Sequence, residues 1–296
     1  ADEIVKLAHR LHGKRALIVV SHSLQRAEHG EQPVWMGMVL AAALGQIGLP
    51  GGGYGYALGA IAYYGRQLNA VPVPTLSQGR NSVRDFIPVA RIADMLLNPG
   101  AAYRFNGETR TYPDIKLVYW AGGNPFHHHQ DLNRLRKAFR RLDTLVVHEL
   151  AWTATAKHAD VVLPATMTLE REDIGASSND PLLVPMRPVA APYGEARDDY
   201  AIFSELAKRL GREQEFTEGR TVRQWLEHLY EPTRQQLAEK GLPAPGFDEF
   251  WESDGFLMPQ RPDDGGYLRA FRENPEGKPL RTPSGKPPRS SPRRTC

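Results

Sequence analysis

The chain has 296 residues, 41% of them hydrophobic, which is enough apolar material for a substantial core in two connected lobes. Its one cysteine is Cys296, so disulfides, cysteine-rich zinc sites and an internal iron–sulfur cluster are excluded for this sequence. The net charge of +3 arises near the end: from Lys278 onward there are six Lys/Arg and no Asp/Glu, and the 31 basic residues before Lys278 are outnumbered by 34 acidic ones.

A first α/β lobe is predicted in the opening part of the chain. An amphipathic helix ends at Gly13, and a buried strand follows at residues 16–20. Polar side chains come after this strand, at the end where an α/β sheet meets its ligands. They are Gln25, Arg26 and Gln32. The guanidinium of Arg26 offers a planar fork of donors that suits phosphate; a surface loop with an Arg26–Glu31 ion pair is the alternative.

A helix at residues 34–49 is apolar on most faces and is predicted to be buried. Its glycines and Gln46 interrupt it, so no membrane span is expected. The three glycines at residues 51–53 look like a phosphate loop, but no Gly-Lys-Ser/Thr follows them, which excludes a Walker site. Prolines punctuate residues 56–112 and indicate loop-rich structure, with one helix at residues 88–97.

The second lobe begins with an apolar, β-prone run at residues 115–121, typical of a strand buried on both faces. Gly122, Gly123 and Asn124 follow, and a helical pattern starts at Asp131. Because glycine has no Cβ, a diphosphate can approach the backbone N–H groups here, and the start of the helix adds partial positive charge. The pattern indicates a phosphate site, and a purely structural turn is the alternative.

A second strand at residues 143–149 completes a βαβ unit and ends in His148 and Glu149. In dinucleotide folds this position recognises a nucleoside, because a carboxylate accepts hydrogen bonds from a ribose or a purine edge. Thr153 and Asp160 follow on a short helix and at the start of a third strand.

Three consecutive histidines, His127, His128 and His129, invite a metal hypothesis. Adjacent residues point in different directions, no second His/Cys group stands nearby, and Asp131 fits better as a helix cap. We therefore predict no metal site and expect His128 to hydrogen-bond a phosphate. A hydrolase is not expected either, because Ser21 lacks the Gly-x-Ser-x-Gly elbow.

Three segments of this lobe carry a family resemblance: Gly-Gly-Asn-Pro at residues 122–125, residues 153–164, and Glu-Arg-Glu-Asp at residues 170–173. In this spacing the chain resembles the molybdopterin oxidoreductases of the dimethyl sulfoxide reductase superfamily. Residues 23–26, 30–32 and 44–53 are similar to the biotin sulfoxide, dimethyl sulfoxide and trimethylamine N-oxide reductases, with biotin sulfoxide reductase nearest. The resemblance runs over nearly the whole chain and covers the middle portion of such an enzyme.

The resemblance implies an α/β fold of two Rossmann-like lobes with mostly parallel sheets, a helical peripheral segment and a disordered basic tail. It implies a molybdenum bis(molybdopterin guanine dinucleotide) cofactor and the reduction of S-oxides or N-oxides by oxygen-atom transfer. The cofactor-binding positions that it implies are Gln25, Arg26, Gln32, Gly122, Gly123, Asn124, His128, His148, Glu149, Thr153 and Asp160. The family's molybdenum ligand, a serine in this subgroup, is expected before Ala1, so no catalytic or metal-binding residue is assigned here. His22 stands where the family usually carries a tryptophan.

Four segments are expected: a partial α/β lobe at residues 1–112, a Rossmann-like guanine-dinucleotide-binding lobe at 113–212, a helical and aromatic peripheral segment at 213–277, and a disordered basic tail at 278–296. After Lys286 the chain turns into Pro, Arg and Ser, where the family continues into an apolar strand. We therefore expect a frameshift or a truncation at this point.

Two functional hypotheses stay open. In the first, the chain supplies the cofactor-binding lobes of an S-oxide or N-oxide reductase, whose electron donor is unknown and which a separate fragment completes. In the second, it is a truncated, non-catalytic remnant that at most binds a nucleotide or pterin dinucleotide. The second hypothesis is favoured for this polypeptide alone, which is expected to be inactive by itself, and the first for the family. An NAD-dependent enzyme is a weaker third hypothesis, because the glycine turn is not Gly-x-Gly-x-x-Gly. Nucleic acid is not an expected partner, and the absence of a signal in this sequence favours the cytoplasm over the periplasm.

Overall fold

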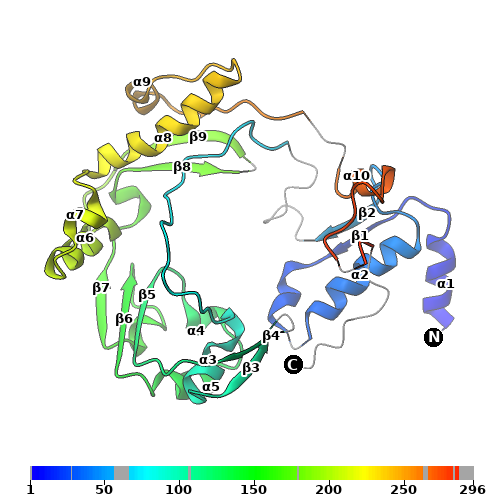
Figure 1. The fold of residues 1–296 in the computed structure, drawn as a ribbon, viewed down its shortest axis with the longest axis horizontal. Coiled ribbons are helices and arrows are strands. Elements are labelled where there is room, and N and C mark those ends of the chain that lie inside the picture. The colour runs from blue at the N-terminus through cyan, green and yellow to red at the C-terminus, as the bar shows by residue number, and fades with distance from the viewer. Residues whose placement is uncertain are drawn as a thin grey trace. The chain divides into compact units, whose positions relative to one another are not determined.

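The computed structural model describes residues 2–27, 29–56, 67–105, 108–178, 180–262, 266–282 and 284–286 (Figure 1). The chain forms two compact units, and each is described by itself. One unit joins residues 1–68 to residues 260–296, and the other holds residues 69–259. The boundaries of the four segments expected from the sequence differ from those of these two units and stay a prediction. The predicted disorder of residues 287–296 concerns residues outside the described ones.

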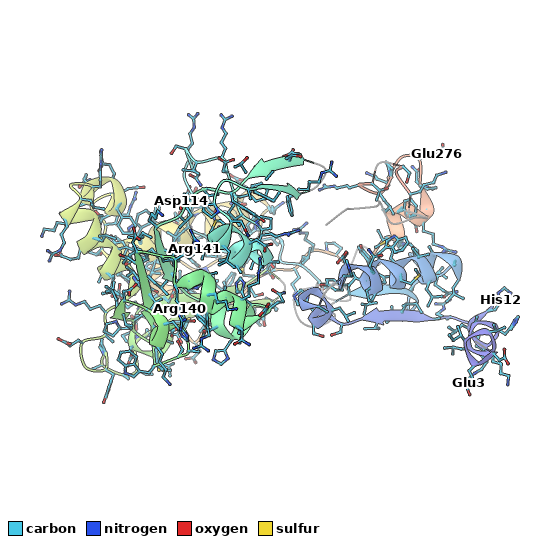
Figure 2. The ribbon with its side chains drawn as sticks, turned by 90° about the horizontal axis from the view of Figure 1, so that it is seen from below. Glu3, His12, Asp114, Arg140, Arg141 and Glu276 are labelled. Atoms are coloured by element: carbon cyan, nitrogen blue, oxygen red, sulfur yellow. The ribbon has the colours of Figure 1, made fainter. Side chains whose placement is uncertain are left out.

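The first unit is built on a βαβ arrangement. Strand β1 (Leu17–Val20) pairs in parallel with β2 (Gly53–Tyr56), and helix α2 (Glu31–Ala43) connects them after a short turn, η1 (His22–Arg26). The predicted helix at residues 34–49 is wrong at both ends, since α2 begins at Glu31 and ends before Gly45, which has a φ of +68°. Helix α1 (Asp2–Leu11) precedes β1, and the polar side chains of Glu3 and His12 lie exposed near its two ends (Figure 2).

Val20, Ala41, Ile47 and Tyr54 form the core of this unit. Burial raises the pKa of Tyr54 to about 12, and its hydroxyl donates to the carbonyl of Val34 over 3.0 Å. The late helix α10 (Arg269–Glu273) joins this core through Phe271, and the guanidinium of Arg272 donates to the carbonyls of Gly45 and Ile47. Residues near the end of the described chain therefore pack against a core whose other members come from the first 56 residues.

The second unit opens with η2 (Val89–Arg91), α3 (Ile92–Leu97) and the antiparallel pair β3 (Ala102–Phe105) and β4 (Glu108–Thr111). A three-stranded parallel sheet follows, in the order β5 (Leu117–Ala121), β6 (Thr144–Glu149) and β7 (Val161–Pro164). Helices α4 (Pro125–His128) and α5 (Leu132–Phe139) connect β5 to β6, and η3 (Ala156–His158) precedes β7. This sheet confirms the βαβ unit predicted for residues 115–149, and its core contains Leu135, Ala138, Leu145 and Val147.

An antiparallel sheet and a group of helices complete this unit. After η4 (Thr168–Glu170), the sheet has the order β10 (Phe256–Leu257), β9 (Asp180–Met186) and β8 (Asp173–Ser177). The helices are α6 (Asp199–Arg209), α7 (Glu213–Thr217), α8 (Val222–Glu239) and α9 (Phe247–Glu252). Tyr230 of α8 stacks on Phe250 of α9 with ring centroids 4.7 Å apart, so aromatic side chains of these helices form part of a hydrophobic core.

The fold as described is α/β, with two parallel sheets and two antiparallel ones. The parallel sheets arise where apolar strands alternate with helices, and they confirm the predicted class. Within the described residues, no helix combines the length and the apolar character that a membrane crossing requires.

Candidate nucleotide site at the end of the parallel sheet

The candidate site lies at the carboxyl ends of β5 and β6. The register pairs Ala121 with His148 and Glu149 with Pro164, so the residues that follow β5 and β7 emerge at the level of Glu149. In open parallel sheets this edge is where ligands bind. The sequence-predicted positions Gly122, Gly123 and Glu149 are therefore brought to one edge.

The glycine turn after β5 is open to a ligand. Gly122 and Gly123 have φ values of +82° and +77°, a backbone conformation that residues with a side chain rarely adopt. A Cβ at Gly122 would meet no heavy atom within 4 Å, and one at Gly123 would meet only the indole nitrogen of Trp120 at 3.7 Å. Both glycines are exposed, so a ligand can approach their backbone directly.

Asn124 ties this turn to the loop that follows β6. Its side-chain oxygen accepts a hydrogen bond from the hydroxyl of Thr155, a fully buried residue. Its backbone carbonyl accepts from the N–H groups of His127 and His128 in the single turn of α4. Asn124 thus fixes the shape of the turn, while the His128 side chain is exposed beside it.

Glu149 is held in place by its own loop. One carboxylate oxygen accepts from the hydroxyl of Thr153 over 2.9 Å, and the other accepts from the N–H of Leu150 over 3.2 Å. The Thr153 hydroxyl in turn accepts from the N–H of Ala156 over 3.2 Å. Each carboxylate oxygen has two lone pairs, so a half-buried Glu149 held this way can still accept hydrogen bonds from a ligand.

His148 points away from this edge and into the protein. Its Nε2 lies 2.7 Å from the hydroxyl of Tyr119 and its Nδ1 lies 2.6 Å from a carboxylate oxygen of Asp199, at the start of α6. Burial, and next the charge of Asp199, raises the pKa of Tyr119. Because both ring nitrogens have protein partners, we leave His148 out of the ligand set proposed below.

Asp160 lies at the opposite end of the strands. It precedes β7, its carboxylate accepts from the N–H of Leu145 over 2.8 Å, and its own N–H donates to the carbonyl of Leu145. These bonds join the beginnings of β6 and β7. Its predicted contact with a cofactor stays a prediction, and the structure does not bring it to the edge that holds Glu149.

The remaining predicted positions belong to the other unit. Gln25 and Arg26 lie in η1, after β1, and their side chains fall outside the described residues, as does the Arg26–Glu31 alternative. Gln32 lies in the first turn of α2, where its side-chain nitrogen is 3.5 Å from Glu31. The ring of His22 lies 5.4 Å from that of Tyr56.

Sequence reasoning did not assign Thr166, the second residue after β7. Its side chain is 4% exposed, and its hydroxyl has no hydrogen-bond partner in the described part of the chain. The only sequence signal was its place after an apolar strand in a parallel sheet.

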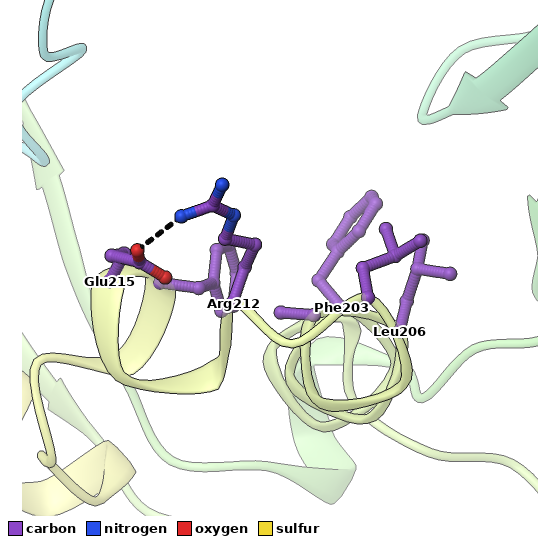
Figure 3. A pocket seen from close by; sticks show the side chains of 7 residues that line it. Phe203, Leu206, Arg212 and Glu215 are labelled. Carbon is purple, nitrogen blue, oxygen red and sulfur yellow. Dashed lines mark hydrogen bonds and ion pairs between the residues drawn. The ribbon is translucent and has the colours of Figure 1, made fainter.

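A separate hollow of about 500 Å³ lies between α6 and α7 (Figure 3). Phe203 and Leu206 line it from α6, and the ion pair of Arg212 with Glu215 lies at α7. Phe203 also packs against His148, with ring centroids 4.9 Å apart. No group of three or more His, Cys, Asp or Glu side chains suited to a metal occurs among the residues that the structure describes.

The fold is α/β, and the carboxyl ends of its three-stranded parallel sheet carry an open glycine turn and an oriented carboxylate. The family model for molybdopterin oxidoreductases matches residues 5–209, more than half of the sequence. The chain belongs to the molybdopterin oxidoreductase family, which confirms the resemblance of its motifs.

Its relatives include S-oxide and N-oxide reductases. The biotin sulfoxide reductase of Cereibacter sphaeroides is 48% identical over 96% of this chain and 38% of that protein. A dimethyl sulfoxide/trimethylamine N-oxide reductase of the same organism is 45% identical over 96% of this chain and 36% of that protein. The trimethylamine-N-oxide reductase of Haemophilus influenzae is 43% identical over 97% and 37%. The chain therefore spans little more than a third of the length of these relatives.

Proposed function

We propose that this chain provides cofactor-binding lobes of a molybdenum-dependent S-oxide or N-oxide reductase. In this proposal, the edge of the β5–β6–β7 sheet holds the nucleotide end of a molybdopterin guanine dinucleotide. The observation that carries it is the carboxylate of Glu149, oriented by Thr153 at the end of β6, beside the open glycine turn at the end of β5.

The chemistry of these groups fits a guanine nucleotide. Guanine carries two donors side by side, N1–H and the N2 amino group, and these can donate to the two oxygens of one carboxylate. Adenine places an acceptor beside its amino donor, which a carboxylate repels. The exposed backbone of Gly122 and Gly123 would receive the diphosphate, with His128 as a further hydrogen-bond partner.

The proposals for the pterin part, the bis form of the cofactor and the substrate rest on similarity to the family and its members. Gln25, Arg26 and Gln32 of the first unit would hold the pterin part or a second dinucleotide, giving the bis form of the cofactor. When bound, the molybdenum cofactor supplies the oxygen-atom transfer, and the residues of this chain bind and orient it. An S-oxide or N-oxide is the proposed substrate because the relatives named above act on such compounds.

The test is to purify the full chain from a molybdenum-replete host and to measure molybdenum, pterin and acid-released GMP per polypeptide. Stoichiometric GMP and pterin are expected. A folded sample without pterin or GMP contradicts the proposal. GMP in a sample that does not reduce oxides would favour the second hypothesis, nucleotide binding without catalysis.

A variant links this result to Glu149. Glu149→Gln keeps the side-chain size and removes the charge, so we expect GDP to bind about tenfold to a hundredfold more weakly in a calorimetric titration. Glu231→Gln is the matched control, because Glu231 lies on α8 and pairs with Arg234 over 2.6 Å, away from the sheet edge. Equal GDP affinity for wild type and Glu149→Gln would remove Glu149 from the site.

A further inference from the structure

Thr166 stands at the end of the third strand of the candidate site. The N–H of Ala165, the residue before it, donates to the carbonyl of Glu149 over 3.0 Å. Thr166 is therefore the residue next to one that bonds the backbone of Glu149. In the function proposed above, Glu149 recognises the nucleoside. The three strands thus each deliver a polar or open position to the same edge: Gly122, Glu149 and Thr166.

The backbone of Thr166 is fully used by the protein. Its N–H donates to the carbonyl of Arg197 over 3.1 Å, and its carbonyl accepts from the guanidinium of Arg171 over 3.1 Å. These two bonds fix the position of the residue from both sides. The hydroxyl is then the one polar group of Thr166 that lacks a partner among the described residues.

An unsatisfied buried hydroxyl is costly. A polar group removed from water without a hydrogen bond destabilises a protein, and the large majority of buried side-chain polar atoms in native structures have a partner. Valine would fill the same volume at no such cost. The retained hydroxyl therefore requires an explanation outside the packing of the chain.

We propose that Thr166 is a further ligand of the nucleotide site, and that its hydroxyl hydrogen-bonds the nucleoside end of a guanine nucleotide. This inference rests on the function proposed above. Because the strand order is β5–β6–β7, Glu149 lies between the glycine turn and Thr166. If the phosphates bind at the glycine turn, Thr166 lies on the side of Glu149 that faces away from them, where the nucleoside would bind. The hydroxyl is covered in the chain alone, so the side chains that cover it must move aside for the nucleotide to reach it.

The test compares two substitutions in the full chain. Thr166→Val removes only the hydroxyl, so GDP should bind about fivefold to tenfold more weakly in a calorimetric titration. Its melting temperature without ligand should equal or exceed that of the wild type, because no protein hydrogen bond is lost. Thr166→Ser keeps the hydroxyl and should restore GDP binding to the wild-type level.

Thr233→Val is the matched control. Thr233 is also 4% exposed, but its hydroxyl donates to the carbonyl of Pro72 over 3.1 Å. This substitution should lower the melting temperature and leave GDP affinity unchanged.

Three outcomes overturn the inference. If Thr166→Val binds GDP as tightly as a GDP-binding wild type, Thr166 is not a ligand and the proposed function stands. If Thr166→Val lowers the melting temperature as much as Thr233→Val does, the hydroxyl has a partner in the protein and our premise fails. If the wild type itself does not bind GDP, the proposed function fails and takes this inference with it.

Discussion

His148 and Glu149 are neighbours with different tasks. Successive side chains of a strand point to opposite sides of the sheet. The Glu149 side chain therefore lies at the open edge, while the His148 side chain packs on the side of the sheet that faces α6. There His148 joins Tyr119 of β5 to Asp199 of α6. The sequence predicted both residues as ligands because both end an apolar strand. It could not show that Asp199, 51 residues later in the chain, takes one of the imidazole nitrogens.

Asp94 offers a test of acid sensitivity. This α3 residue pairs with Arg91 over 3.0 Å and with Arg134 of α5, and it links the two helices. Partial burial raises the pKa of Asp94, but the hydrogen bonds and charges of the two guanidinium groups outweigh it, and the net result is a pKa below the ordinary value. A carboxyl group with a lowered pKa stabilises the fold above its ordinary pKa, and this stabilisation is lost as the pH falls through the folded-state pKa.

We therefore expect Asp94→Asn to lower the free energy of unfolding by about 1 kcal/mol at pH 7. The difference from the wild type should shrink as the pH falls below about 4, where the carboxyl group of the unfolded chain becomes protonated, and it should vanish below the lowered folded-state pKa. Urea unfolding between pH 7 and pH 3 measures both effects. Asp248→Asn, at a side chain that is 97% exposed, should change stability little at any pH. A difference at Asp94 that stays constant over this range would contradict the electrostatic explanation.

Helix α2 packs closely on β1 because it has a glycine at the contact. A Cβ at Gly37 would lie 2.5 Å from a methyl carbon of Val20 and 3.1 Å from the ring of Tyr54. An alanine inside a helix normally gives a protein about 0.5 to 1 kcal/mol more stability than a glycine at the same position. Here the overlap must move the helix or the side chain of Val20, so packing opposes the helix propensity.

Gly37→Ala should therefore destabilise the chain by about 1 to 3 kcal/mol, against the direction of helix propensity. Chemical denaturation followed by circular dichroism measures this change. Ala43→Gly, at the exposed last residue of the same helix, should cost less than about 1 kcal/mol through propensity alone. If Gly37→Ala stabilised the chain, the close approach of α2 to β1 would be refuted.

The sequence predicted the elements better than their partners. Apolar runs predicted β5 and β6, and the glycine turn between β5 and the next helix was clear, because these signals are local. The antiparallel pairing of β8 with β9 was not predicted. Neither was the bond from Arg272 to the carbonyl of Gly45, which joins residues 227 positions apart. Such contacts depend on tertiary packing, so a short pattern in the chain does not encode them. The orphaned hydroxyl of Thr166 was missed for the same reason, since its burial comes from distant segments.

The chain leaves one unit and returns to it. Residues 69–259 form the second unit, and its first and last residues lie side by side, since the N–H of Ala70 donates to the carbonyl of Pro259 over 2.8 Å. Each described hydrophobic core belongs to one unit: two clusters lie within residues 69–259, and the third joins the first 56 residues to Phe271 and its neighbours. The second unit thus has the properties of a domain inserted into the first.

We expect residues 69–259 to fold when expressed alone, because their cores need no residue of the other unit and their two ends meet. Since Gly122, Glu149 and Thr166 all lie in this segment, its affinity for GDP should equal that of the full chain within about threefold. Thermal unfolding and a calorimetric GDP titration of both polypeptides measure these properties. A segment that folds but binds GDP tenfold more weakly would show that Gln25, Arg26, Gln32 or other residues of the first unit take part in holding this nucleotide.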